Sequence, residues 1–402
     1  MTATATPLLD PADPAFRADP YPTWRALREG GSVRRLEDTR DWIVTGYREV
    51  RTLLRDPRTG YAGAEPEPAP TTDIDVPFVR ARAKALSILE TFMHRRAPED
   101  HKRLRRVARP ALNEPAAKAR RARMEELVDA SVERALANGG MDVIADLARP
   151  LAVTIAAELV GIPAQVRSQL DGWGREMTYW IEIWPTPVER ERGILAMASL
   201  APRLREISPE SGTILAALRQ ANADGQITED EAISHAALFF LAAHVTTVNL
   251  IGNGLLALVR NPNQWQLLRE RPAAIASAVE ELLRFDTPGP AIKRRAREDI
   301  EVGRHAISRG DLIVLSLAAA NRDPAAFPEP DRLDLTRSPN PHLSFGHDAH
   351  YCLGAAFARL EAQIAIGTLA RSVARIRLAT EEPEREDWFV VRGLKSLPIE
   401  FA

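Results

Sequence analysis

The sequence has 402 residues, 45% hydrophobic and 27% charged, so it can bury a large core and is too polar overall to be embedded in a membrane. Its 53 basic and 55 acidic residues give a formal net charge of −2, which argues against a general nucleic-acid or anionic-membrane binder. A single cysteine excludes internal disulfides and multi-thiolate metal clusters. The N-terminal residues show no basic segment followed by an apolar stretch, so we expect a cytoplasmic protein.

In the first half of the chain we expect one short strand and then a mainly helical region. A strand around Trp42–Thr45 precedes a glycine turn and a helix that ends before Pro57. Residues 62–76 are rich in Pro, Asp and Thr, and a loop of this length in a compact domain is more often functional than idle. From about residue 100 to 215 the pattern is mainly helical, interrupted by prolines.

An aromatic stretch near residue 180 has two interpretations. Tyr179, Trp180, Trp184 and Pro185 lie close together in the sequence. Either they end a core helix, or they form a mobile apolar lid.

Residues 228–260 predict a long buried helix. Thr228 and Glu231 have the spacing of an N-terminal capping box, and the run Ala236–Val259 contains no charged residue other than His244, which is charged only when protonated. The run is long enough to span a membrane, but it contains several polar residues and the sequence holds no second span. A helix that is apolar on all sides in a soluble protein is a buried central helix, and we adopt that interpretation.

After this helix the sequence alternates between helical and short β segments. A helix is expected over residues 273–285 and another from about Ala355 to Ala374. The β-prone segments are 292–299, 300–303 and WFVVRG at 388–393, and 311–320 suits either state. The 30 prolines are spread along the chain and mark no linker. We therefore expect one domain over residues 1–402, mainly α with a minor β region.

The lone cysteine, Cys352, lies in a glycine-punctuated segment that enters a helix. Unpaired backbone N–H groups and the positive end of the helix dipole stabilise a thiolate there. This environment suits a metal ligand or a nucleophile, although a single cysteine is more often a buried inert thiol.

The segment PHLSFGHDAHYCLGAAFARLEA resembles the haem-binding loop of the cytochrome P450 family, with Phe345 seven residues before Cys352 and Gly354 two residues after it. Gly346 follows the phenylalanine. The resemblance implies that Cys352 is the axial ligand of a haem iron, where a thiolate favours O–O cleavage. Asp348 stands where the family usually has a second glycine, and aspartate is among the non-glycine residues that best tolerate a positive φ.

Zinc is the alternative metal for this segment, because His347 and His350 lie close to Cys352. The segment offers no convincing fourth ligand. Zinc would also leave three further motifs that resemble the same family unexplained.

The first of these motifs is AVEELLRF, in which Glu281 and Arg284 lie one helical turn apart and suit a bidentate ion pair. In the family an arginine from a later irregular segment joins this pair, and Arg332 is the expected third member. The resemblance implies a buried structural triad that supports the cysteine loop. The alternative is an ordinary solvated pair.

The second motif is the helix PEDHKRLRRVARPAL. On it His101 and Arg105 share an otherwise apolar face, and the resemblance implies that they bind the haem propionates together with Arg294 and His350. The opposite face is basic and is a candidate docking site for an acidic redox partner, unless it is simply solvated. It carries Lys102, Arg106 and Arg109.

The third motif is the oxygen-activating segment of the central helix, which in the family commonly reads Ala-Gly-His-Glu-Thr-Thr. Here it includes Ala242, Ala243, His244, Val245 and Thr246. Ala242 and Thr246 stack on one face, and a mid-helix threonine hydroxyl can bond to the carbonyl four residues earlier or open a groove there. Thr246 is therefore the expected donor that positions a proton for oxygen activation, with Ala242 and Ala243 as further candidate catalytic residues. Val245 replaces the usual acid and cannot relay protons. Because adjacent helical residues diverge by ~100°, we expect His244 to be a core residue or to face outward.

Together the resemblance implies the cytochrome P450 fold: a triangular prism of helices with a small β region, a central buried helix and haem b. The implied activity is that of a monooxygenase that uses O₂ and electrons from NAD(P)H, delivered by a separate ferredoxin and ferredoxin reductase. The expected substrate is a hydrophobic small molecule, such as a secondary-metabolite or antibiotic intermediate, free or bound to a carrier protein. Its pocket would be lined by Phe239, Ala243, Gly289, Pro290, Ala291 and Ile292.

Two other functions remain open. One is an atypical member of the family that performs oxidative coupling or cyclisation, which the replacement at Val245 suggests. The other is a haem protein that binds a ligand without turnover.

Overall fold

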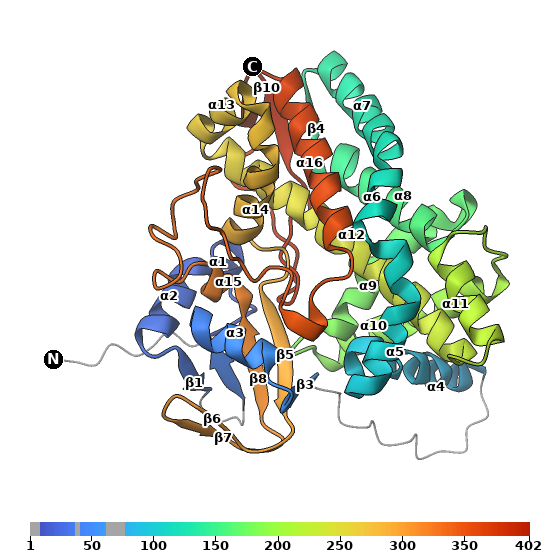
Figure 1. Ribbon diagram of the computed structural model, residues 1–402. Helices are drawn as coiled ribbons and strands as arrows, with labels where there is room; N and C mark the ends of the chain where they lie inside the picture. The colour runs from blue at the N-terminus through green and yellow to red at the C-terminus, as the bar shows by residue number, and fades with distance from the viewer. Residues whose placement is uncertain (1–8, 37–40, 62–76) are drawn as a thin grey trace. The chain divides into compact units, whose positions relative to one another are not determined.

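The computed structural model describes residues 9–36, 41–61 and 77–402 (Figure 1). The loop expected at 62–76 lies outside these ranges. The chain divides into two compact units: unit 1 comprises Met1–Gly60, Arg120–Leu151 and Thr246–Ala402, and unit 2 comprises Tyr61–Ala119 and Ala152–Val245. Two helices, α8 (Arg149–Val160) and α12 (Glu229–Val259), continue from one unit into the other. The prediction of a mainly α-helical chain with a minor β region is confirmed.

All described strands belong to unit 1. They form a five-stranded sheet of order β1-β2-β8-β5-β3, a three-stranded sheet of order β4-β10-β9 and a β6-β7 hairpin. The strands are β1 (Val33–Arg35), β2 (Trp42–Val44), β3 (Thr59–Gly60), β4 (Gly140–Asp142), β5 (Ala291–Ala296), β6 (Ile300–Val302), β7 (His305–Ile307), β8 (Leu312–Ser316), β9 (Ile376–Leu378) and β10 (Pro398–Phe401).

The five-stranded sheet joins distant parts of the sequence. Strand β2 pairs in parallel with β8, with Trp42 opposite Ile313, whereas β5 pairs with β8 in the antiparallel direction. Helix α3 (Tyr47–Arg55) contributes apolar side chains to the same buried core as the sheet. Its first backbone N–H, that of Tyr47, donates to Asp323 at 2.8 Å, because Gly46 at the N-cap has no side chain to accept it. The strand and helix predicted here are confirmed.

Unit 1 also contains further helices. They are α1 (Pro14–Ala18), α2 (Tyr21–Glu29), α7 (Arg121–Asn138), the π-helical segment η2 (Val143–Ala148), α13 (Pro262–Glu270), η4 (Pro272–Ala274), α14 (Ile275–Phe285), α15 (Leu317–Asn321), η5 (Asp348–His350) and α16 (Ala355–Ser372). Helix α16 packs on α7, α13 and α14.

The segment 311–320 is both strand and helix. Strand β8 ends at Ser316, whose hydroxyl accepts the N–H of Ala319 at 3.1 Å and starts α15. The β prediction for WFVVRG is wrong, because residues 388–393 are irregular. The backbone groups of Arg392 bond outside any sheet: its N–H donates to Pro288 O at 2.8 Å and its carbonyl accepts from Asn253 Nδ2 at 2.9 Å.

Unit 2 is helical over its described residues. Its helices are α4 (Pro77–Glu90), η1 (Met93–Arg95), α5 (Pro98–Leu112), α6 (Glu114–Ala119), η3 (Ala164–Val166), α9 (Arg167–Ile181), α10 (Pro187–Glu206) and α11 (Ile214–Ala223), with most of α8 and the first half of α12. Helix α10 packs on α4 and α9, and α11 packs on α5. A capping box between Thr186 and Glu189 starts α10.

Helix α12 is the long buried helix that the sequence predicts. The N–H of Glu231 donates to Thr228 Oγ1 at 3.1 Å, and the Glu231 carboxylate accepts the Thr228 N–H at 2.9 Å, so the capping box is confirmed. Length and composition alone would let α12 cross a membrane, and no other described helix meets that test. However, 78% of its most apolar window is buried within the protein, as in the core helix of a globular protein.

Candidate functional site

The cysteine loop belongs to unit 1 and leads into helix α16. Cys352 is exposed on it, and its backbone N–H donates to the carbonyl of Phe345 at 2.9 Å. Gly346 has a φ of +71°, a conformation that glycine adopts without steric cost, whereas Gly354 is the N-cap of α16 at a negative φ. The loop thus returns on itself and presents the sulfur beside a helix N-terminus, where the helix dipole favours a thiolate.

Asp348, the residue that departs from the expected glycine, adopts a φ of +57°. The loop therefore keeps the left-handed turn with an aspartate, one of the side chains that tolerate it best. Its carboxylate lies 3.5 Å from the Arg55 guanidinium of α3, and both side chains are about half exposed. The departure changes the surface charge of the loop while its backbone keeps a glycine-like conformation.

A polar network that the sequence analysis missed holds the Phe345 ring. The guanidinium of Arg359 lies 4.4 Å from the centre of this ring, donates to the Tyr351 hydroxyl at 3.0 Å and forms two hydrogen bonds to Glu280 at 2.7 and 2.8 Å. Burial alone would raise the pKa of Glu280, but hydrogen bonds from Arg359 and His342 lower it from 4.5 to about 2. Glu280 and Arg359 are far apart in the sequence, so no local spacing could have revealed the pair.

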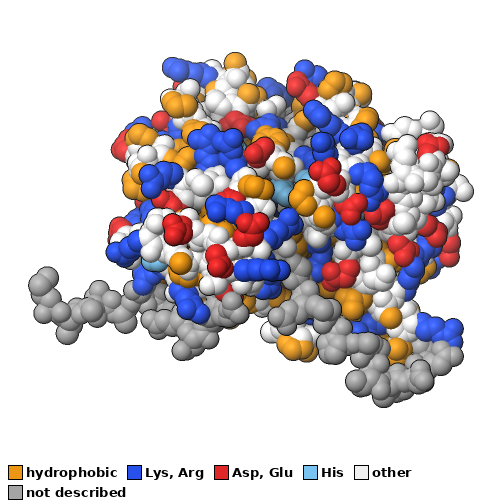
Figure 2. All heavy atoms as spheres, turned by 60° about the horizontal axis from the view of Figure 1, so that its bottom comes forward, with side chains coloured by type: hydrophobic (Ala, Val, Ile, Leu, Met, Phe, Trp, Pro, Cys, Tyr) orange, Lys and Arg blue, Asp and Glu red, His pale blue; other side chains and the backbone are white. Residues whose placement is uncertain are grey.

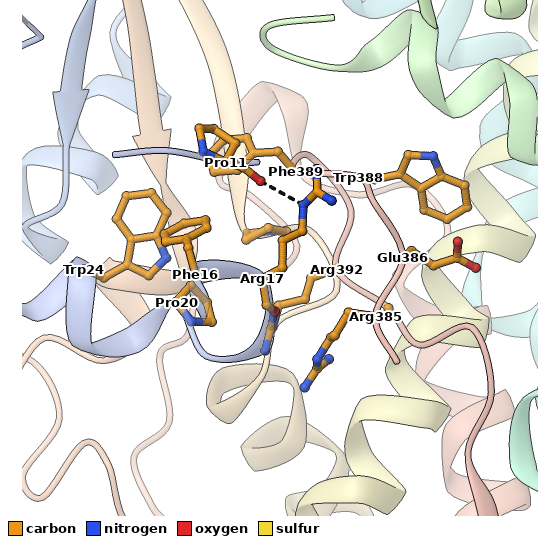
Figure 3. Close-up of a pocket in the computed structure, with 12 residues that line it drawn as sticks. Pro11, Phe16, Arg17, Pro20, Trp24, Arg385, Glu386, Trp388, Phe389 and Arg392 are labelled. Carbon is orange, nitrogen blue, oxygen red and sulfur yellow. Dashed lines mark hydrogen bonds between the residues drawn. The ribbon is translucent and has the colours of Figure 1, made fainter. Parts of the chain in front are cut away.

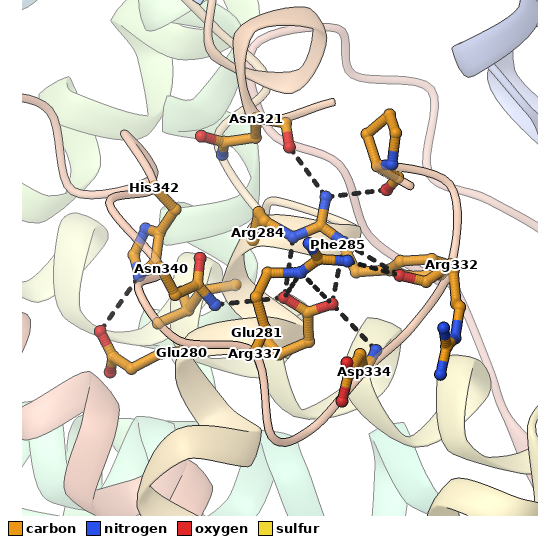
Figure 4. A network of polar contacts seen from close by, with 12 residues as sticks. Glu280, Glu281, Arg284, Phe285, Asn321, Arg332, Asp334, Arg337, Asn340 and His342 are labelled. Atoms are coloured by element: carbon orange, nitrogen blue, oxygen red, sulfur yellow. Dashed lines mark hydrogen bonds and ion pairs between the residues drawn. The ribbon is translucent and has the colours of Figure 1, made fainter. Parts of the chain in front are cut away.

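Glu281 and Arg284 form a fully buried ion pair. Figure 4 shows their contacts. Arg284 Nε and Nη2 donate to the two Glu281 oxygens at 2.7 and 2.9 Å. Both side chains are 0% exposed, so this is a structural pair with matched hydrogen bonds, unlike a solvated surface pair.

The third side chain of this cluster is Arg337, which corrects the prediction of Arg332. Arg337 Nε lies 3.1 Å from Glu281, whereas the Arg332 guanidinium pairs with Glu329 at 2.9 Å and is exposed. Arg332 joins the cluster only through its carbonyl, which accepts from Arg284 at 3.3 Å. Both arginines lie in an irregular segment, where spacing does not determine which side chain turns inward.

The buried cluster is connected to the cysteine loop through Asn321. Its carbonyl accepts from Arg284 at 2.9 Å, and its side chain accepts the N–H of Leu343 at 2.7 Å and donates to Ser344 Oγ at 2.8 Å. Leu343 and Ser344 immediately precede Phe345. The cluster thereby fixes the start of the loop that carries Cys352.

Helix α12 carries a partly open stripe on an otherwise buried surface. Ala242 is exposed and Ala243 and Thr246 are half-buried, while Val245 is buried. The four-residue spacing places Ala242 and Thr246 on one face. His244 is 1% exposed: its Nδ1 lies 2.8 Å from Phe240 O, and its ring faces Gly174 of α9, where a β-carbon would collide with it. His244 is a core residue, as expected.

The residues predicted to bind the propionates are spread over both units. In unit 2 His101 is buried and Arg105 half-buried on α5, while Lys102, Arg106 and Arg109 are exposed on the opposite face. In unit 1 Arg294 is buried on β5 and His350 ends η5. The side chains sort onto faces as the helical pattern predicts, and their common contact with one cofactor stays a prediction.

The residues predicted to line a substrate pocket are mostly buried. Phe239 is 7% exposed on α12, and Ala291 is buried in β5 with Ile292 packed against the core of the sheet. Pro290 also lines a small pocket in unit 1, shown in Figure 3. The pocket is bounded mainly by aromatic and arginine side chains: Phe16, Arg17, Trp24, Arg385, Trp388, Phe389 and Arg392.

Next to this pocket, a buried carboxylate anchors the irregular segment 385–393. Asp286 pairs with Arg392 at 2.8 Å and Arg385 at 3.3 Å, and it accepts the Tyr21 hydroxyl at 3.0 Å. Although burial raises its pKa, the charges of Arg392 and Arg385 lower that pKa to about 2. Arg385 also donates to Asn253 of α12 at 2.8 Å, so this segment is bonded directly to the central helix.

The residues of the cysteine loop fit a haem-thiolate ligand better than a zinc site. Over the described part of the chain no three His, Cys, Asp or Glu side chains are grouped to hold a metal ion. Zinc requires about four protein ligands, whereas haem iron takes its equatorial ligands from the porphyrin and one axial ligand from the protein. The single exposed sulfur of Cys352, at a helix N-terminus, matches the one protein ligand that haem iron requires.

The loop and the central helix carry the features expected of the haem-thiolate class, and comparison with known proteins identifies the family. The family model described as "Cytochrome P450" matches residues 205–383. The chain is 35% identical to the biotin biosynthesis cytochrome P450 of Bacillus subtilis (strain 168), with 97% of this chain and 98% of the relative covered. It is 33% identical to the vitamin D(3) 25-hydroxylase of Pseudonocardia autotrophica, with 99% and 98% covered.

A solved structure agrees with this assignment. The structure of P450BioI in complex with hexadec-9Z-enoic acid ligated acyl carrier protein superposes with a TM-score of 0.87 at 34% identity, covering 97% of this chain and 99% of that chain. The chain therefore belongs to the cytochrome P450 family. It is a haem-dependent monooxygenase that incorporates oxygen from O₂, and its electrons come from external redox partners.

Proposed function

We propose that Cys352 is the axial thiolate ligand of haem b, and that Phe345, Gly346 and Gly354 shape the loop around its sulfur. The hydrogen bond from the Cys352 N–H to Phe345 O and the left-handed Gly346 support this assignment. His101, Arg105, Arg294 and His350 are the proposed propionate ligands. When bound, the haem supplies the chemistry of O₂ activation.

Thr246 is the proposed proton donor for oxygen activation, with Ala242 and Ala243 leaving space beside it. The partly open stripe on α12 supports this role, because these three residues are the least buried of its middle turns. The threonine hydroxyl can hold an ordered water or pass a proton. Val245 is buried and apolar, so protons reach Thr246 through water or through a polar group of the substrate.

The proposed substrate is a hydrophobic small molecule, an intermediate of secondary metabolism such as antibiotic biosynthesis. Names of relatives support this class, since they act in biotin and polyketide biosynthesis. The acyl carrier protein bound to P450BioI supports a carrier-tethered substrate. The residues proposed to line the pocket are Phe239, Ala243, Gly289, Pro290, Ala291 and Ile292. Val245 favours oxidative coupling or cyclisation as the second candidate reaction, because an apolar residue replaces the usual acid.

The proposed electron donor is a ferredoxin reduced by a ferredoxin reductase with NAD(P)H. Lys102, Arg106 and Arg109 on the exposed face of α5 offer an acidic protein three cations. Basic and acidic side chains are interspersed on the face shown in Figure 2, so local groups of this kind decide docking more than net charge. We further propose that residues 1–402 act as one cytoplasmic domain, for which the burial of α12 is the supporting observation.

The single observation that carries the proposal is the position of Cys352 at the start of α16. The test is the absorption spectrum of the reduced, carbon-monoxide-bound protein. We expect a red-shifted Soret band from thiolate ligation, its loss in Cys352→Ala, and its retention in the neighbouring control Tyr351→Phe. A Cys352→Ala protein that binds haem and keeps the band would overturn the assignment. Product analysis with a surrogate ferredoxin system then separates a monooxygenase from a coupling or cyclising enzyme.

A further inference from the structure

Two buried hydrogen-bond donors without acceptors lie next to each other in unit 2. The Arg95 guanidinium, at the end of η1, is centred 5.3 Å from the centre of the Trp180 ring, near the end of α9. The Arg95 side chain is 3% exposed and Trp180 is 5% exposed. Within residues 9–36, 41–61 and 77–402, neither Arg95 Nε nor Trp180 Nε1 has a hydrogen-bond partner.

Such donors are costly, because each has lost its water without gaining a protein acceptor. Arg95 does have a partner for its other nitrogen, since Nη2 donates to both oxygens of Glu90 at 2.8 and 2.6 Å. Its guanidinium is therefore held in place while Nε stays unused. Two neighbouring unused donors indicate a site for an acceptor that the described part of the chain does not provide.

The side chains around the Trp180 ring define what that acceptor must be. The Arg190 guanidinium of α10 lies 5.1 Å from the centre of the ring, so the indole ring contacts two guanidinium groups, those of Arg95 and Arg190. All three groups only donate hydrogen bonds. The ligand group must therefore accept hydrogen bonds, and a negative or strongly polarised oxygen suits two cations best.

Apolar surface adjoins these donors. The Tyr61 ring lies 5.4 Å from the Arg95 guanidinium, and the His94 ring packs against Tyr61 at 4.4 Å. Aromatic faces beside fixed donors are the combination that binds an apolar chain ending in an oxygen. Arg190 is half-buried and comes from a different helix, α10.

We propose that Arg95 and Trp180 form a subsite for the acyl oxygen of the substrate, either the carboxylate of a free fatty acid or the thioester carbonyl of a carrier-bound acyl chain. The subsite deepens the proposed function, on which it rests. It makes this monooxygenase selective for acyl chains over hydrocarbons of the same length.

Trp180→Phe is the decisive variant, because it removes the N–H and keeps an aromatic ring under Arg95. Trp184→Phe, half-buried four residues further on, is the matched control. Dissociation constants of the holoenzyme are measured from the ligand-induced spin-state change with hexadec-9Z-enoic acid, its pantetheine thioester and hexadec-7-ene. The acid and the thioester represent the two sources of the acyl oxygen, and the alkene carries no oxygen.

In Trp180→Phe we expect the affinity for the acid, the thioester or both to fall about five- to tenfold, the loss of one hydrogen bond, with the alkene unchanged. Which oxygen-bearing ligand loses affinity identifies the source. Trp184→Phe should change none of the three. Equal weakening of all three ligands by Trp180→Phe, or no weakening of either acyl ligand, would overturn the subsite.

A second readout does not depend on affinity or turnover. In the ferrous carbon-monoxide complex labelled with ¹⁵N-tryptophan, one of the seven indole N–H signals is assigned to Trp180 by its absence in Trp180→Phe. Addition of the preferred acyl ligand should shift this signal downfield, and hexadec-7-ene should not. If the signal stays in place while the red-shifted Soret band is intact, the subsite fails and the haem-thiolate assignment stands; loss of the band in the wild-type protein defeats the proposed function instead.

Discussion

Asn321 accepts the backbone N–H of Leu343 at 2.7 Å while its own carbonyl accepts a hydrogen bond from the buried Arg284. One residue thus connects the Glu281–Arg284 ion pair to the segment that enters the cysteine loop. The ion pair positions Cys352 by fixing the backbone two residues before Phe345.

The first prediction concerns the arginines of this cluster. Arg337→Ala removes a guanidinium from the fully buried Glu281, and leaving a buried charge less compensated costs about 3 kcal/mol. Arg332→Ala removes an exposed side chain paired with Glu329, so it should change stability by less than about 0.5 kcal/mol. Denaturant unfolding and haem retention measure both effects. Equal losses in the two variants would contradict the correction from Arg332 to Arg337.

The second prediction concerns the left-handed turn at Asp348. Asp348→Val places a β-branched residue at a φ of +57° and should cost about 1–2 kcal/mol, with part of the red-shifted carbon-monoxide band lost. Asp348→Gly should stay within about 1 kcal/mol of the wild type, because relief of strain offsets the greater freedom of the unfolded chain. Thermal unfolding and the reduced carbon-monoxide spectrum provide the comparison. A valine variant as stable as the glycine variant would show that the turn is not constrained.

The third prediction concerns the open stripe of α12. Thr246→Ala should lower the product formed per pair of electrons supplied by about tenfold and increase peroxide release, whereas Thr246→Ser, which keeps a hydroxyl, should retain most of this coupling. Stability should change little, because Thr246 is only half-buried. Unchanged coupling in the alanine variant would exclude Thr246 as the donor.

Unlike the half-buried Thr246, Val245 is only 6% exposed, so a substitution there should also affect stability. Val245→Glu introduces a carboxyl into an apolar site, so the variant should lose about 1–3 kcal/mol of stability. Any gain in coupling must be assessed against that loss. A Val245→Glu protein of wild-type stability with severalfold higher coupled turnover would show that the usual acid relay had merely been weakened in this chain.

The fourth prediction concerns two glutamates whose pKa values move in opposite directions. Burial raises the pKa of Glu361 well above 4.5, and its Oε2 has no hydrogen-bond partner among the described residues. Keeping the Glu361 carboxyl buried therefore costs the folded protein no stability below pH 4.5, and the cost grows as the pH rises above that value. Glu361→Gln should be about 1–3 kcal/mol more stable than the wild type at pH 7 and no more stable at pH 4.

The contribution of Glu280 to stability changes with pH in the opposite direction, since its pKa falls from 4.5 to about 2 in the folded protein. Its contribution is fully present above pH 4.5 and is lost as the pH falls toward 2. Glu280→Gln should thus lower stability at pH 7 by at most about 3 kcal/mol and flatten the decline in acid. Unfolding free energies from pH 3 to 8 measure both variants. Parallel pH profiles for the wild type and the two variants would contradict the prediction.

Features that depend on local spacing could be predicted from the sequence. The capping box of Thr228 and Glu231, the burial of α12 and the sorting of α5 into a buried and a basic face all follow from helical periodicity. The tolerance of a left-handed turn by Asp348 follows from side-chain chemistry.

Features that depend on distant contacts could not be predicted. Arg337 and Arg332 are both arginines of one irregular segment, and only the path of the backbone decides which reaches Glu281. The pairing of Glu280 with Arg359 joins two helices far apart in the chain. WFVVRG has strand-forming residues, but Asn253 and Pro288 take the backbone groups of Arg392 that a sheet would need.

The parallel pairing of β2 with β8 has a consequence during synthesis. Trp42 leaves the ribosome early, and its partner Ile313 emerges only when most of the chain has been made. Until then β2 has no parallel neighbour, and exposed apolar strands invite association with other nascent chains. We therefore expect truncated translation products that end before Ser316 to depend on chaperones, while full-length chains are released from them.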